Sequence, residues 1–248
     1  MYLNIDLLDE LKQNYFFFEG CSYVDSISID KGYEIINHAY ELLKHDSNLY
    51  NADIISNLRK AINLRTKDID SNIGFNKITC WENSKMKQWD KLERLGIVKS
   101  LLISKLLKIR NGIEYEGDNA PSLGEYNELI DIVWYFYKST DIFSKVDPDD
   151  CLIEYEIDGI SYWISIEFDF KNHQTIRISG RFPNGFVGKN QKNNNSLKIY
   201  DFKSEDCRKD ERKYDPKMGN IFYSGYIKVS EMTNYIKLLE LVLTKWGL

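Results

Sequence analysis

The period of the hydrophobic pattern changes near residue 147, and this change limits the fold more than any other feature of the chain. Before it, apolar residues recur every three or four positions, which is the period of an amphipathic helix. After it, apolar and polar residues alternate, which is the period of a strand with one buried face. The sequence therefore predicts an α+β protein with an N-terminal antiparallel helical bundle over residues 1–146. A C-terminal antiparallel β-sheet over residues 147–248, closed by a terminal helix, is expected to follow.

Four segments of the first half have the spacing of bundle helices. The first is expected to begin after Asp30 as N-cap and to end near Lys44, and the second covers residues 51–66. The third and longest covers residues 85–113, and the fourth begins after Ser122. Successive helices of this kind run antiparallel and bury their apolar stripes in a shared core.

The second half carries a hairpin signal at Asp158-Gly159. Residues 153–157 and 162–170 alternate on either side of this pair, and an Asp-Gly sequence favours the tight turn of a two-residue hairpin. Further elements are expected at three strands, residues 176–178, 197–202 and 221–229, and in a final helix from its N-cap Ser230 to Trp246.

Composition is that of an ordinary globular protein, with 43% hydrophobic and 29% charged residues. Because no apolar run approaches about 18 residues, we expect no membrane-spanning segment. The first residues carry no basic stretch, so we expect a cytoplasmic protein without a signal peptide. The four cysteines are scattered and form no CxxC pair, which favours reduced thiols over disulfides or a zinc site.

Charge is unevenly distributed along the chain. The net charge of −5 argues against a protein that coats nucleic acid in general. Residues 51–112 and 171–217 are nevertheless basic, whereas residues 113–170 are strongly acidic. The basic segments could form a local phosphate-binding surface, or they could face the acidic segments within the fold. Both interpretations remain open at this point.

The end of the third predicted helix carries an Arg-Asn pair, Arg110-Asn111, followed by a polar turn and Pro121. The next helix ends in an aromatic cluster of Trp, Tyr and Phe side chains. Over residues 30–142 this arrangement resembles the HEPN family of helical RNA-cleaving domains. The stretches that carry the resemblance are Leu58–Arg65, Leu106–Tyr115 and Val133–Asp141.

The resemblance implies a composite site at a homodimer interface formed by the bundle. In this family the Arg holds the scissile phosphate and a His five positions later transfers protons, without a metal. Arg110 would then bind phosphate with Lys108 beside it, and Asn111 would be its polar neighbour. Tyr115 stands where the family has the His, and a phenol with a pKa of about 10 is a poor base at neutral pH. Without the resemblance, Arg110 reads as the partner of Glu114 in a surface ion pair.

The expected function follows from this substitution. Prokaryotic HEPN proteins commonly act in antiviral defence or toxin–antitoxin systems, with RNA, an antitoxin or another defence protein as partner. Because Tyr115 replaces the His, we expect a site that binds RNA, a nucleotide or a partner protein rather than one that cleaves RNA. The alternative is a metal-independent endoribonuclease that uses Arg110, Asn111 and Tyr115 as a variant catalytic site.

Three other sequence patterns contain residue types that can bind a metal or a phosphate. A column of His and Glu side chains on one helix face spans too many turns to hold one ion, so it reads as a solvated face. Residues 148–149 and 167–171 loosely resemble a PD-(D/E)xK nuclease, but a hairpin needs such outward polar residues anyway. Residues 185–189 lack the spacing and the hydroxyl of a phosphate loop. The column of His and Glu side chains consists of Glu34, His38, Glu41 and His45. No metal or cofactor is therefore expected.

Overall fold

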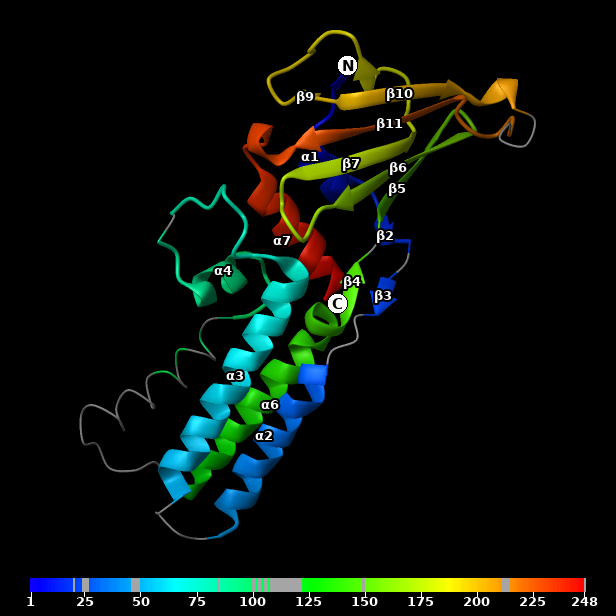
Figure 1. Cartoon of the computed structure of the whole chain (residues 1–248). Helices are drawn as coiled ribbons and strands as arrows, with labels where there is room; N and C mark the ends of the chain where they lie inside the picture. The colour runs from blue at the N-terminus through cyan, green and yellow to red at the C-terminus, as the bar shows by residue number, and fades with distance from the viewer. Residues whose placement is uncertain are drawn as a thin grey trace. The chain divides into compact units, whose positions relative to one another are not determined.

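The computed structural model shows a mixed α+β protein (Figure 1). The residues it describes are 1–19, 21–23, 27–45, 50–83, 85–99, 101, 104, 107, 122–148, 150–210 and 215–247. They fall into two compact units, each assembled from separate stretches of chain. The sheet unit consists of Met1–Ser22, Lys77–Ser84 and Pro148–Val242, and the helical unit consists of Tyr23–Asn76, Lys85–Asp147 and Leu243–Leu248.

Three long helices lie side by side in the helical unit: α2 (Ile27–Leu43), α3 (Asn51–Ile73) and α6 (Leu123–Lys145) (Figure 1). Tyr33 near the start of α2 contacts Asp141 near the end of α6, so these helices run antiparallel. On α3, Ala61 contacts Tyr137 and Arg65 contacts Asp141, so α3 and α6 run parallel. These are the directions expected of the first, second and fourth helices of an antiparallel bundle.

The helix boundaries of α2 and α4 differ from the sequence prediction. Helix α2 begins at Ile27, before Asp30, so the predicted N-cap is wrong. The long helix predicted over residues 85–113 is not continuous, because α4 (Gln88–Arg94) ends at Arg94 with Leu95 as its C-cap. Gly96 then adopts a φ of 72°, a left-handed conformation that an α-helix cannot continue. The interruption is local backbone geometry that the apolar stripe through this segment does not reveal.

Two other helices of this unit have ends that local chemistry explains. Helix α3 extends past the predicted end at residue 66 to Ile73, where Gly74 forms a left-handed C-cap. Helix α6 begins where predicted, because Ser122 is its N-cap and forms a capping box with Glu125. The apolar stripe predicted for α6 is buried in the structure, including Tyr126 and Tyr137.

A six-stranded antiparallel sheet forms the centre of the sheet unit, in the order β10-β11-β7-β6-β5-β2. The hairpin predicted at Asp158-Gly159 joins β5 to β6, and both turn residues have positive φ, 52° and 73°. One face of the sheet is buried and apolar, as the alternation predicted. The strands are β2 (Phe16–Phe18), β5 (Cys151–Ile157), β6 (Ile160–Phe168), β7 (Thr175–Arg181), β10 (Tyr200–Asp206) and β11 (Ile221–Lys228).

The first residues of the chain belong to the sheet unit, whereas the sequence placed them with the bundle. Strand β1 (Tyr2–Leu3) pairs with both β8 (Val187–Gly188) and β9 (Leu197–Lys198). Helix α1 (Leu7–Gln13) follows, and its Glu10 accepts a hydrogen bond from Tyr155 of β5. These partners lie far away in the sequence, so local periodicity carries no signal of the pairing.

The remaining elements complete the two units. The short strands β3 (Cys21–Tyr23) and β4 (Val146–Pro148) lie where the chain passes between the units. A 3₁₀ turn over Cys207–Lys209 follows β10, and another over Val229–Glu231 precedes α7 (Tyr235–Trp246). Because α7 begins at Tyr235, the predicted cap Ser230 is wrong. No helix within the described ranges is long and apolar enough to cross a membrane.

Candidate functional site

The residues that the sequence predicts for the site, Lys108, Arg110, Asn111 and Tyr115, lie outside the described residues. Three other features gather polar or aromatic side chains. The first is a buried charge network in the helical unit. The second is an aromatic groove on the same unit, and the third is a polar pocket in the sheet unit. Each is built by residues from elements that are distant in the sequence.

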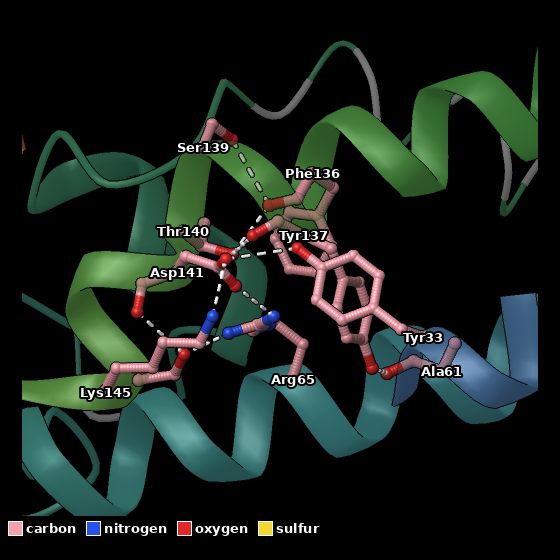
Figure 2. Close-up of polar contacts among 10 residues, drawn as sticks. Tyr33, Ala61, Arg65, Phe136, Tyr137, Ser139, Thr140, Asp141 and Lys145 are labelled. Atoms are coloured by element: carbon pink, nitrogen blue, oxygen red, sulfur yellow. Dashed lines mark hydrogen bonds and ion pairs between the residues drawn. The ribbon is translucent and has the colours of Figure 1, made fainter. Parts of the chain in front are cut away.

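The charge network centres on Arg65 and Asp141 (Figure 2). The Arg65 side chain is fully buried, and its Nη2 lies 2.6 Å from Asp141 Oδ1. Its Nη1 donates a hydrogen bond to Ser144 Oγ, and the guanidinium carbon lies 4.1 Å from the centre of the Tyr137 ring. The Tyr137 ring and the Asp141 carboxylate stabilise the Arg65 charge, which would otherwise be costly to bury.

Asp141 also receives hydrogen bonds from its own helix α6 and from α2. Lys145 Nζ lies 2.8 Å from Asp141 Oδ2, and the Tyr33 hydroxyl donates to the same oxygen at 3.1 Å. Burial would raise the pKa of Asp141, but the hydrogen bond from Lys145 and the charge of Arg65 outweigh burial and lower it. Burial and the charge of Asp141 raise the pKa of Tyr33 to about 12. At neutral pH the Asp141 carboxylate is therefore charged, and the Tyr33 phenol keeps its proton and donates a hydrogen bond to it.

The network joins α2, α3 and α6 at one level of the helical unit. Tyr137 extends it, because its hydroxyl donates to the Ala61 carbonyl at 2.6 Å and burial raises its pKa. This geometry favours a role in holding the helices in register. The sequence prediction assigned Arg65 no such role, although its spacing from Leu58 and Ile62 places it on the buried side of α3, where a charge needs a partner.

The aromatic groove lies between α2 and α6 and has a volume of about 320 Å³. Three of its side chains are large and exposed: Tyr40 (47%), Trp134 (39%) and Tyr135 (64%). The Trp134 and Tyr135 rings meet edge to face, with centres 5.1 Å apart. Clustered exposed aromatic side chains are typical of an interaction surface. The other residues lining the groove are Ile36, Asn37, Ile130 and Asp131.

The polar pocket, hereafter the sheet pocket, is the larger hollow, with a volume of about 620 Å³. Its sides come from the segment before Trp81, from the turn between β6 and β7, and from the end of β11. None of these segments stands out in the sequence as a site, because sheet pairing brings them together. The lining residues are Lys77, Thr79, Asn172, His173, Gln174, Thr175, Tyr226, Lys228 and Ser230.

His173 anchors the turn that borders this pocket. Its backbone has a φ of 53°, which is uncommon for a residue other than glycine. The turn is held by a bond from the His173 amide to the Asp169 carbonyl, 2.7 Å, and by contact between His173 Nδ1 and the Tyr235 hydroxyl, 2.7 Å. Burial raises the pKa of Tyr235, so its phenol keeps its proton.

The described side chains include several His, Cys, Asp and Glu residues that could in principle bind a metal. No group of three or more His, Cys, Asp or Glu residues in these ranges could hold an ion. Glu41 of the sequence-predicted column instead pairs with Lys44 at 2.7 Å, and Glu167 of the nuclease-like pattern pairs with Arg177 at 3.1 Å. The side chains of Cys80 and Cys207 are free thiols.

No protein-family model, curated protein or solved structure matches the chain. The geometry and chemistry of the side chains described above are therefore the ground on which a function is proposed.

Proposed function

We propose that this protein is a homodimeric HEPN-like protein of a prokaryotic defence or toxin–antitoxin system. Its Arg110 site binds RNA or a nucleotide, or docks a partner protein, rather than cleaving RNA. The observation that carries the proposal is the exposed face of α6, which is complementary to itself. The order and directions of α2, α3 and α6 also agree with the antiparallel bundle that the resemblance implies.

The α6 face has a symmetric arrangement of charge around its aromatic centre. Trp134 and Tyr135 are exposed at the centre, with exposed Asp131 one turn before them and exposed Lys138 one turn after. A two-fold axis through the Trp134-Tyr135 centre would pair two antiparallel copies of α6. Each Asp131 would then face Lys138 of the other copy. A surface that satisfies itself under two-fold rotation is what a symmetric homodimer requires.

Binding of phosphate is supported by basic side chains on a second helix of the same unit. Helix α3 exposes Arg59, Lys60 and Lys67. Clustered basic side chains attract nucleic-acid phosphates and release counterions on binding. Arg110 is the phosphate ligand that the family resemblance implies, and Tyr115 can donate a hydrogen bond but is a poor base. Binding without cleavage is therefore the function we favour.

Titration of the full-length protein with fluorescein-labelled single-stranded RNA tests the proposal. We expect salt-sensitive binding that Arg110→Ala weakens about tenfold or more, because a charge-assisted contact to phosphate is lost. Lys237→Ala is the matched control, since Lys237 is exposed on α7 in the sheet unit. Light scattering at tens of micromolar should report a dimer. Equal RNA affinity of wild type and Arg110→Ala, together with a monomeric mass, would contradict the proposal.

A further inference from the structure

We propose that the sheet pocket is a nucleotide-binding site, in which Lys77 and Lys228 hold the phosphate and the Tyr226 ring supports the base. This proposal concerns the sheet unit alone and gives it a ligand of its own. Its volume of about 620 Å³ lies in the range of pockets for small ligands.

The charge of the pocket favours an anion. Lys77 and Lys228 both line it, and none of its described lining residues is acidic. The neighbouring carboxylates are held by other groups: Asp169 Oδ1 accepts from the Asn172 amide at 3.1 Å, and Glu231 accepts from the Tyr200 hydroxyl. The pocket lining therefore includes two lysines and no described carboxylate. This charge suits a phosphate group.

The aromatic side of the pocket favours a base over a simple anion. Tyr226 lines the hollow and stacks on Tyr200, with ring centres 5.5 Å apart and planes inclined by 18°. Lys228 Nζ lies 4.3 Å from the centre of the Tyr200 ring, on which the Tyr226 ring stacks. A tyrosine ring beside a lysine is the pairing that binds a base and its phosphate in single-stranded nucleic acids.

The rest of the lining supplies groups that can orient such a ligand. Asn172, Gln174 and Ser230 offer amide and hydroxyl groups at the rim, where their residues are exposed. His173 provides a fixed wall, because the Tyr235 hydroxyl holds its ring and its backbone is kept at positive φ. Backbone strain that the surrounding structure maintains is concentrated at binding sites in proteins.

Isothermal titration calorimetry of the full-length protein with AMP, adenosine and inorganic phosphate tests the inference. We expect AMP to bind about tenfold or more tightly than either fragment, because only AMP engages the lysines and the ring together. Lys77→Gln and Lys228→Gln should each weaken AMP about tenfold through loss of a charge-assisted contact. Lys189→Gln, at an exposed lysine outside the pocket, is the control and should bind AMP as wild type does.

The ring contact is tested with two substitutions at one position. Tyr226→Ala should weaken AMP about tenfold, whereas Tyr226→Phe keeps the ring and should stay within about twofold of wild type. Thermal unfolding of each variant verifies that the fold is retained. The inference is overturned if AMP binds no better than phosphate and Tyr226→Ala has no effect, or if no heat is detected at millimolar AMP.

Two sources of the nucleotide are separated by hexa-adenylate RNA with and without a 5′-phosphate. A site for a strand end predicts that the 5′-phosphorylated RNA binds at least as tightly as AMP, and that the 5′-hydroxyl RNA does not. A site for a free nucleotide predicts that AMP binds more tightly than both. In Arg110→Ala, which removes the proposed ligand of the helical unit, the AMP binding that remains should still be weakened by Lys228→Gln. If Arg110→Ala abolishes AMP binding while Lys228→Gln does not, the nucleotide binds in the helical unit, and the sheet-pocket inference fails while the Arg110 proposal stands.

Discussion

Arg65 and Asp141 form an ion pair that joins α3 to α6, with 2.6 Å between Nη2 and Oδ1 and no exposed surface on the arginine side chain. Taking a guanidinium fully out of water is unfavourable unless its partner and further hydrogen bonds replace the water. Ser144, the Tyr137 ring and Asp141 replace most of that water, and the buried Nε is left without a hydrogen-bond partner among the described residues. The pair therefore links the packing of the three helices to one carboxylate.

Replacing Asp141 by alanine should destabilise the protein by about 3 kcal/mol, because the buried Arg65 charge loses its partner. Lys145→Ala removes the partly exposed neighbour of the same carboxylate and should cost less than about 1 kcal/mol. Urea unfolding followed by circular dichroism measures both. Equal losses for the two variants would show that Arg65 does not depend on Asp141.

The same carboxylate predicts how stability changes in acid. An aspartate has an unfolded pKa of about 3.9, and the pKa of folded Asp141 lies below its usual value. The folded state then binds fewer protons than the unfolded state, so its contribution is present in full above about pH 5 and is lost as the pH falls through the folded pKa. Between about pH 5 and pH 2, the free energy of unfolding should fall more steeply in wild type than in Asp141→Asn. Parallel slopes would exclude Asp141 as a source of acid sensitivity.

Reversing one charge on the α6 face should weaken the proposed dimer. Asp131→Lys or Lys138→Asp would place like charges opposite each other across the two-fold axis. We therefore expect the dissociation constant of the dimer to rise about tenfold. The double variant Asp131→Lys/Lys138→Asp restores complementarity and should recover the wild-type value. Sedimentation equilibrium measures all three. A double variant no better than the singles would argue against this α6–α6 pairing.

Restoring the family's imidazole should create or raise ribonuclease activity. Tyr115→His introduces a group that titrates near neutral pH, and general acid–base help of this kind contributes roughly a hundred- to ten-thousand-fold. Cleavage of labelled RNA should appear without added metal, persist in EDTA and vanish when Arg110→Ala is combined with it. If the histidine variant cleaves no RNA beyond wild type, the binding function stands. If wild type cleaves and the variant is weaker, Tyr115 has a catalytic role of its own.

Elements whose determinants are close in sequence were predicted well. Helix α6 was expected to begin after Ser122, and the capping box with Glu125 explains why it does. The hairpin at Asp158-Gly159 was expected from the turn residues and the alternation around them. Both depend on residues within a few positions of each other, so the local sequence is sufficient to predict the helix start and the hairpin.

Gly96 shows where local patterns are insufficient. The apolar stripe through residues 85–113 continues past this glycine, yet α4 ends at Arg94 and Gly96 is left-handed. A glycine within a helical pattern permits a break without requiring one. The candidate site residue Arg110 lies outside the described residues, so its role remains a prediction from the resemblance.

The sequence by itself determined the class of each half, the hairpin and the start of α6. Only the tertiary structure decided that Met1–Ser22 belongs to the sheet unit, that Arg65 pairs with Asp141, and that Lys77 meets Tyr226 and Lys228 around one pocket. The physical reason is the range of the interactions. Periodicity and capping act between neighbours along the chain, whereas strand pairing and ion-pair burial act between residues that only the folded chain brings together.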